Sequence, residues 1–106
     1  MWKICIDNDE MFSNAEYIFP TQQSDVSKIV KKFSENDSVK RIIIFGSSVT
    51  SACNPWSDID VYVELDKDVR IGKPQTGVPI DLWTNYDVDE HLMYEIDRKG
   101  VVVYAR

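Results

Sequence analysis

Apolar and polar positions divide the chain into short buried segments separated by polar turns. The clearest apolar run, residues 42–45, stops abruptly at Gly46 and Ser47. A short apolar run that ends at a turn signal is typical of a buried strand. Other segments either repeat this pattern or alternate strictly between apolar and polar residues. These patterns predict strands near residues 40–46, 58–65, 78–83 and 101–104.

Two further segments have the spacing of amphipathic helices. The first is expected at residues 24–35, with Ser24 as N-cap and Asp25 in the first turn, where the helix dipole favours a negative charge. The second is expected at residues 87–98, where Asp87 and Glu90 resemble a capping box and Gly100 marks the end. Apolar residues at helical spacing define the buried faces: Val26, Ile29, Val30 and Phe33 in the first helix, and Val88, Leu92 and Ile96 in the second.

Strands interleaved with two helices predict an α/β (α+β) fold, a mixed β-sheet flanked by helices. With 106 residues, the chain is expected to form one domain, residues 1–106. Residues 1–20 read as an N-terminal extension of unclear role. Alternation of Trp2, Ile4 and Ile6 with polar residues predicts a short half-buried strand there. A second apolar run, residues 17–19, is expected to pack against the main sheet or to form a partner-facing patch.

Composition narrows the classes of function. The chain is 43% hydrophobic and 28% charged, which is typical of a globular domain, and its formal net charge is −6. This charge argues against nonspecific nucleic-acid binding, which depends on a basic surface. Cys5 and Cys53 are too few for a zinc site, although they leave room for one disulfide. Without a transmembrane-length apolar run or a signal-peptide pattern, a cytoplasmic protein is expected, with no membrane association.

Three aspartates are the candidate catalytic and metal-binding residues. Asp58 and Asp60 open a predicted strand and, two positions apart, point to the same face. Side-by-side carboxylates repel each other, so the arrangement calls for a cation. Asp81 lies on the next predicted strand and reaches the same place if the two strands are neighbours. We therefore expect Asp58, Asp60 and Asp81 to form one site.

Gly46 and Ser47 are the candidate phosphate-binding residues. Residues 49–53 are expected to form a short helical turn before Pro55, so that Gly46 and Ser47 stand at a strand-to-helix corner. Free backbone N–H groups at such a corner bind phosphate, and glycine allows a close approach. The serine hydroxyl adds another donor.

Gly46-Ser47, ten intervening residues, Asp58-x-Asp60, and then Asp81 on a following strand resemble the nucleotidyltransferase superfamily of the DNA polymerase β type. The short chain, Ser57-Asp58-Ile59-Asp60 and the ending Lys99-Gly100-Val101 look like its minimal nucleotidyltransferases (MNT). The resemblance covers about residues 24–104. It implies the nucleotidyltransferase fold, Mg²⁺ held by the three aspartates, and a nucleoside triphosphate, expected to be ATP, at the Gly-Ser corner. It also implies transfer of AMP to a hydroxyl acceptor, with a helical HEPN-type toxin as protein partner and the chain as its antitoxin.

The chain departs from this family at one place. Related sequences often carry arginine soon after Gly-Ser, whereas this chain has Thr50 at the matching position. A triphosphate would then depend more on metal, on backbone amides and on the cationic loop at residues 66–77, which contains Lys67, Arg70 and Lys73. Two readings stay open: an enzyme that transfers a nucleotide, and a catalytically weak, antitoxin-like interaction module. A third reading, modification of a small molecule, would ordinarily need an added helical domain.

Overall fold

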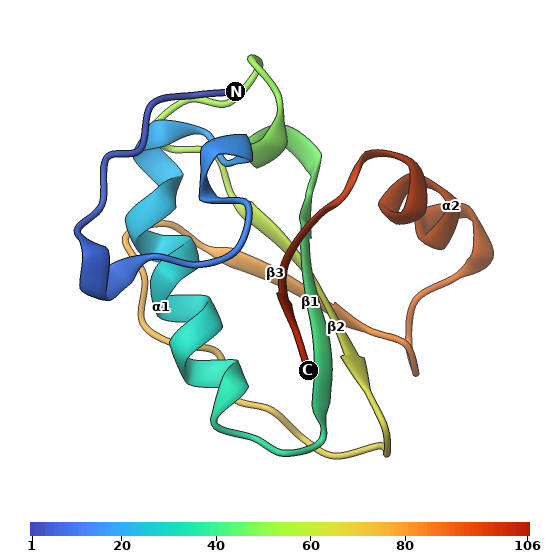
Figure 1. The fold of residues 1–106 in the computed structure, drawn as a ribbon. Helices are drawn as coiled ribbons and strands as arrows, with labels where there is room; N and C mark the ends of the chain where they lie inside the picture. Colours follow the sequence, from blue (N-terminus) through green and yellow to red (C-terminus); the bar gives the residue numbers. More distant parts are fainter.

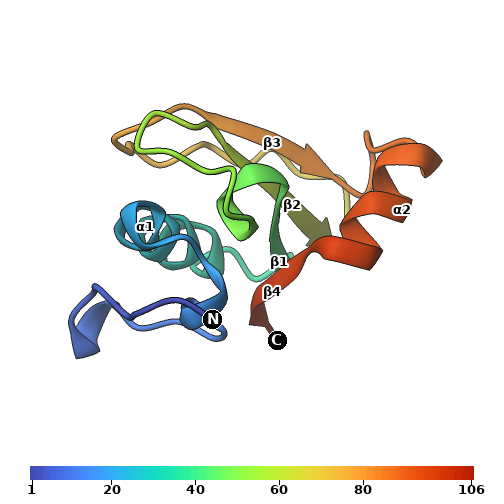
Figure 2. The same ribbon diagram turned by 90° about the horizontal axis from the view of Figure 1, so that it is seen from above.

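A computed structural model describes all residues, Met1–Arg106. It has a four-stranded mixed sheet with strand order β3-β2-β1-β4. Central strand β1 (Val39–Phe45) is antiparallel to both β2 (Ile59–Leu65) and β4 (Val101–Ala105), whereas β2 is parallel to edge strand β3 (Ile80–Thr84). Helices α1 (Gln23–Ser34) and α2 (Glu90–Lys99) lie on opposite faces of this sheet (Figures 1 and 2). The predicted α/β class with a mixed sheet and flanking helices is confirmed.

The two faces of the sheet pack against different helices. Alternate residues of β2, beginning with Ile59 and Val61, join α1 residues such as Ile29 and Phe33 in the larger core. The opposite face of β2 presents Tyr62, which packs with Ile96 of α2 in a smaller cluster. This alternation follows from the two-residue period of a strand. It places Asp60, two residues before Tyr62, on the α2 face.

The sequence predicted the existence of both helices but misplaced their starts. Helix α1 begins at Gln23, after a 3₁₀ turn at Pro20–Gln22, so Ser24 lies inside the first turn instead of capping it. Helix α2 begins at Glu90 and is capped by Asp89, whose carboxylate accepts a hydrogen bond from the Leu92 amide at 2.7 Å. Asp87 does not cap the helix because its carboxylate accepts the Thr84 amide at the end of β3.

The N-terminal extension does not form the predicted strand. Residues 1–5 have no regular structure, although Trp2, Ile4 and Ile6 are half-buried and alternate with exposed neighbours as the pattern indicated. No strand edge pairs with them; instead, the buried Gln23 side chain binds the Cys5 amide and the Lys3 carbonyl. Ile18, from the second apolar run, is fully buried in the larger core, which confirms that this run packs against the sheet.

Two smaller expectations are resolved as well. The turn expected at residues 49–53 occurs earlier, as a 3₁₀ helix at Gly46–Val49, because Gly46 turns the chain at once with φ +73° and Thr50 is already extended. Cys5 and Cys53 are both free. No helix has the length and apolar character needed to cross a membrane.

Candidate nucleotide-transfer site

The end of β1 and the starts of β2 and β3 bring the predicted site residues together at one end of the sheet. Strand β1 ends at Phe45, which pairs with Asp60 near the start of β2. Asp60 in turn pairs with Asp81 near the start of β3, in parallel register. In a parallel pair, residues opposite each other point to the same face, so both carboxylates lie on the α2 face. The predicted neighbour relation of the two strands is confirmed.

Gly46 makes room for the Asp60 carboxylate. Its φ of +73° lies in the left-handed region that side-chain-bearing residues rarely adopt. A Cβ built on Gly46 would overlap the Oδ2 atom of Asp60. Both the backbone turn and the close approach of the carboxylate therefore require glycine here. We call the end of the sheet that carries Gly46, Asp60 and Asp81 the acidic end.

Asp60 is the most perturbed carboxyl of this end. Its pKa is raised to about 6, first by burial and then by the nearby charge of Asp81 and a hydrogen bond with it. Asp58 and Glu95 raise it further through charge repulsion. None of the chain's four salt bridges neutralises Asp58, Asp60 or Asp81. Glu95, on α2, is an acid of this region that the sequence analysis missed, because nothing in the helical pattern separates it from other exposed acids.

Asp58 is less tightly held than the other two predicted aspartates. It lies one residue before β2 and is exposed. The three aspartates do not form one tight cluster: the three acids whose ligand atoms all lie within 4.8 Å of one another are Asp7, Asp9 and Glu10. That group belongs to a local turn closed by hydrogen bonds between Asp7 and Glu10. This group lies in the N-terminal extension, far in sequence from the three predicted aspartates, and it is largely exposed.

Hydrogen bonds to Gln22 and within the turn hold the Gly-Ser corner in place. Ser48 is fully buried, and its hydroxyl donates to Oε1 of Gln22 at 3.2 Å. Ser47 is half-buried. Its carbonyl accepts hydrogen bonds from both the amide and the hydroxyl of Thr50, at 3.0 and 3.1 Å. The Thr50 side chain is therefore committed to the corner itself and offers no positive charge to a phosphate.

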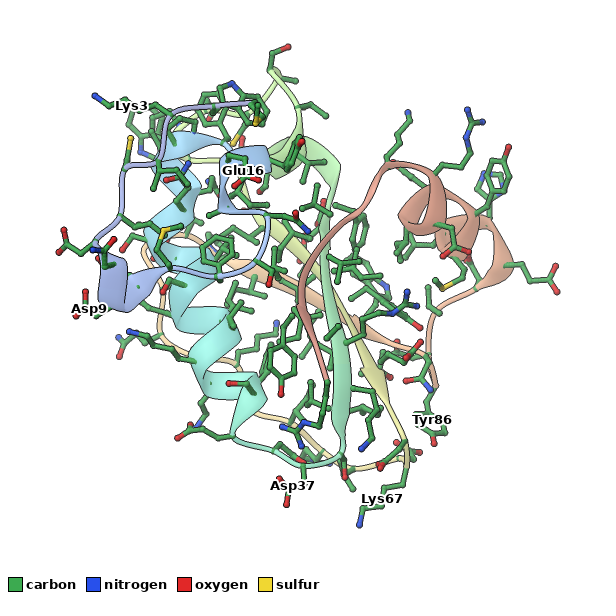
Figure 3. All side chains as sticks on the ribbon, in the orientation of Figure 1. Lys3, Asp9, Glu16, Asp37, Lys67 and Tyr86 are labelled. Atoms are coloured by element: carbon green, nitrogen blue, oxygen red, sulfur yellow. The ribbon has the colours of Figure 1, made fainter.

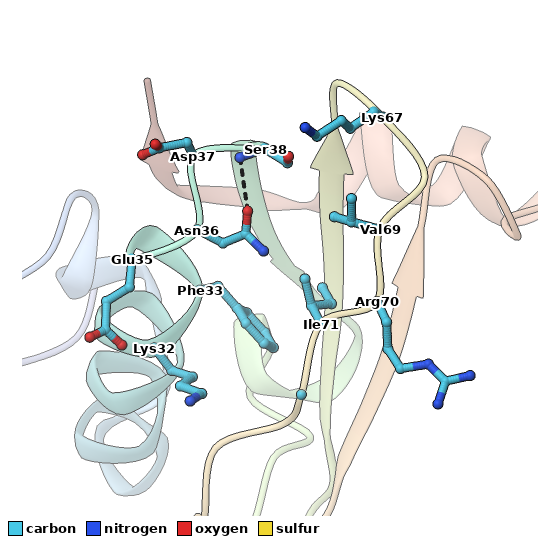
Figure 4. Close-up of a pocket in the computed structure, with 11 residues that line it drawn as sticks. Lys32, Phe33, Glu35, Asn36, Asp37, Ser38, Lys67, Val69, Arg70 and Ile71 are labelled. Atoms are coloured by element: carbon cyan, nitrogen blue, oxygen red, sulfur yellow. Dashed lines mark hydrogen bonds between the residues drawn. The ribbon is translucent and has the colours of Figure 1, made fainter.

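The cations of the loop after β2 are divided between the two ends of the molecule. Lys67 and Arg70 line a pocket of about 620 Å³ that also includes Lys32 and Phe33 of α1 (Figure 4). Lys67 lies beyond the last residue of β2, seven residues from Asp60, which corresponds to about 20 Å along extended chain. Figure 3 shows Lys67 beside Asp37, at the end of β1 remote from the corner. Lys73 instead lines a hollow that reaches Ile80, next to Asp81.

The acidic donor set suits a hard divalent cation. Carboxylate oxygens are the ligands that Mg²⁺ prefers. Asp60 and Asp81 are already neighbours without a counter-ion, and the exposed side chain of Asp58 is free to rotate toward them. These residues therefore fit a magnesium site at the acidic end.

A mixed sheet with an acidic edge beside a Gly-Ser corner defines a class of nucleotide-handling domain. A model of the nucleotidyltransferase domain family matches residues 26–104, which is most of the chain. The chain therefore belongs to the nucleotidyltransferase domain family. The comparison with curated proteins found no match. The match does not cover residues 1–25, which include the N-terminal extension.

Proposed function

We propose that the chain transfers a nucleoside monophosphate, AMP from ATP, to a hydroxyl acceptor at the acidic end. The observation that carries this proposal is the pairing of Asp60 with Asp81 beside Gly46, at the position where the family match and the sequence motif coincide. Carboxylates held together without a counter-charge are costly unless a cation joins them. Mg²⁺, when bound, would neutralise the triphosphate and the leaving pyrophosphate.

Each residue has a separate part in the proposed reaction. Asp58 and Asp60 would hold the metal, while the corner at Gly46 and Ser47 orients the phosphate chain. The acceptor oxygen attacks the α-phosphorus, and the bond from that phosphorus to the bridging oxygen of pyrophosphate breaks. Asp81 would favour loss of the acceptor's proton by accepting it. The acceptor in this proposal is a side-chain hydroxyl of a helical, HEPN-type toxin.

A second candidate function is an antitoxin-like interaction module that acts by binding its partner without transfer. Two observations favour it. Thr50, where relatives often have arginine, is occupied with the Ser47 carbonyl. The carboxylate of Asp58 is not gathered with those of Asp60 and Asp81 into a cluster within 4.8 Å.

One experiment separates the two candidates. The protein is incubated with the product of the neighbouring gene, Mg²⁺, and ATP labelled on either the α or the γ phosphate. Transfer of AMP places the α label, and not the γ label, on the partner protein, and releases pyrophosphate. The Asp58→Asn/Asp60→Asn double variant should give no label. A partner that binds the parent chain tightly but remains unlabelled would overturn the transfer proposal and support the interaction module.

A further inference from the structure

Gln22 is a buried polar residue just before the part of the chain that the family model matches. It ends the 3₁₀ turn Pro20–Gln22, and its side chain is 1% exposed. The family match begins four residues later, at residue 26. A buried amide is costly unless its donor and acceptor are both satisfied. Its two partners therefore identify what this residue does.

The Gln22 side chain joins two separate segments of the candidate site. Its Oε1 accepts the Ser48 hydroxyl at 3.2 Å, and its Nε2 donates to the Ser57 carbonyl at 3.0 Å. Because a carbonyl can only accept, the second bond fixes which way the amide points. Ser48 belongs to the 3₁₀ helix that begins at Gly46, and Ser57 directly precedes Asp58. The Gln22 side chain thus connects the corner that is proposed to bind phosphate with the residue directly before Asp58.

Few other interactions fix the segment before Asp58. Residues 50–58 lie outside all helices and strands. Within the segment, the Asn54 amide donates to the Ser57 hydroxyl, and the Ser57 amide donates to the Asn54 carbonyl, both at 3.0 Å. These bonds lie within the segment, and Thr50 at its start donates to the nearby Ser47 carbonyl. The one hydrogen bond between residues 51–58 and a distant part of the chain is the bond that Ser57 accepts from Gln22. The bond from Gln22 to Ser57 therefore anchors this loop to the body of the protein.

We infer that Gln22 is a positioning residue: it sets the separation between the corner at Gly46 and Ser47 and the loop that carries Asp58. The inference rests on the proposed function in taking these two segments as the parts that hold phosphate and metal. Through it, a residue that precedes the family match supports the site. A second bond acts in the same direction, because the Phe19 amide donates to the Ser48 carbonyl at 2.8 Å.

The neighbouring residue provides a matched control. Gln23 is 0% exposed, and its side chain makes three hydrogen bonds, to the Cys5 amide and to the carbonyls of Lys3 and Ile18. It has no bond to the candidate site. Gln23→Met therefore removes a buried glutamine with similar loss of hydrogen bonding, but leaves both segments of the site in place. Gln22→Met removes the connection while nearly conserving side-chain volume.

The test measures amide hydrogen exchange in the protein without nucleotide and then Mg²⁺-dependent ATP binding. In Gln22→Met, exchange at the Ser57 and Thr50 amides should rise about tenfold relative to Ile44 in the sheet centre, as expected for loss of a buried hydrogen bond. In Gln23→Met these two amides should keep the parent's relative rate, while Cys5 exchanges faster. The dissociation constant for Mg²⁺-ATP should rise about tenfold in Gln22→Met and less than about twofold in Gln23→Met.

A gentler variant protects the test against a general loss of folding. Ser48→Ala removes only one of the two Gln22 bonds and should weaken Mg²⁺-ATP binding about threefold. Unchanged relative exchange at Ser57 in Gln22→Met and at Thr50 in Ser48→Ala overturns the inference, whatever happens to ATP. Faster exchange with parent-like ATP affinity also overturns it, because Gln22 would then stabilise the loop without positioning the site. If the parent itself fails to bind Mg²⁺-ATP, the proposed function fails, and exchange alone decides whether Gln22 couples the two segments.

Discussion

The two ends of the sheet differ in whether their carboxylates are paired with lysine or arginine. At the end where β1 starts and β2 finishes, three ion pairs join Arg41 to Glu64, Lys40 to Asp66, and Arg106 to Asp37. We call this the paired end. At the acidic end, Asp60 and Asp81 stand together and no lysine or arginine pairs with them. The same sheet thus neutralises carboxylates at one end and leaves them unneutralised at the other.

This difference indicates what the acidic end is for. The side chains of these pairs range from partly to fully exposed, and exposed ion pairs add little to the stability of the folded state. At the acidic end, burial and then repulsion from Asp81 raise the pKa of Asp60, which costs the folded state free energy at neutral pH. Perturbed carboxyls of this kind cluster at functional sites, which supports the proposed cation site.

The largest effect is expected from filling the space beside Asp60. Gly46→Ala forces a side chain into the left-handed region, which costs about 1–2 kcal/mol, and displaces the Asp60 carboxylate. We expect urea unfolding to show this loss and ATP to give no Mg²⁺-dependent stabilisation. Gly72→Ala is the control, because a Cβ there meets nothing within 4 Å. Parent-like ATP binding by Gly46→Ala would show that the close packing against Asp60 is irrelevant to the site.

The stability of the folded state should depend on pH through Asp60. Because the folded-state pKa of Asp60 is about 6, above its ordinary value of 3.8, the group favours the folded state most below about pH 4 and loses that contribution as pH rises through 6. Asp60→Asn lacks this dependence. In EDTA, it should be more stable than the parent at pH 7.5 by about 1 kcal/mol after solvent screening, with the advantage shrinking toward pH 4.

Urea unfolding of the parent and Asp60→Asn across this pH range measures the difference. Glu64→Gln, at the paired end, serves as control and should not be more stable than the parent at pH 7.5, because it loses the ion pair with Arg41. An advantage of Asp60→Asn that stays constant with pH would mean that the acidic end does not strain the folded state.

The smallest effect is expected from the cations of the remote pocket. Lys67 lies about 20 Å from Asp60 along the extended strand β2, beyond the reach of a triphosphate held at the acidic end. Lys67→Ala should change the dissociation constant for Mg²⁺-ATP by less than about twofold, since an exposed charge at this distance is screened. We expect the same of Arg70→Ala, because Arg70 is exposed and lines the same pocket as Lys67. Isothermal titration at physiological salt measures this constant. A tenfold loss of affinity in either variant would indicate that the nucleotide binds near the remote pocket and not at the acidic end.

The periodic parts of the fold were predictable from the sequence. The i, i+2 spacing placed Asp60 and Tyr62 on one face of β2, and the next strand became its neighbour, which brought Asp81 alongside. Helix starts were less predictable, because Asp87 and Asp89 have the same capping chemistry. The choice between them depends on the Thr84 amide, which binds Asp87 only once β3 has formed.

Other features have no signal in the hydrophobic pattern. Trp2, Ile4 and Ile6 alternate like a strand, but this segment pairs with neither edge strand of the sheet. The side chain of Gln23 supplies hydrogen bonds to its backbone instead. Gln22 reads as an ordinary polar residue before a helix. Its burial becomes evident only when Ser48 and Ser57, distant in sequence, meet at its amide.

The central claim is that the acidic end binds a metal and a nucleoside triphosphate together. Its most direct test is thermal unfolding of the parent and of Asp58→Asn/Asp60→Asn with ATP, at a series of Mg²⁺ concentrations. A ligand at about a hundred times its dissociation constant stabilises the folded state by about 2.7 kcal/mol. We predict a clear Mg²⁺-dependent rise in the melting temperature of the parent and none in the double variant, whose ligand-free form is at least as stable. Equal stabilisation of both proteins, or none of the parent at any Mg²⁺ concentration, would contradict the claim.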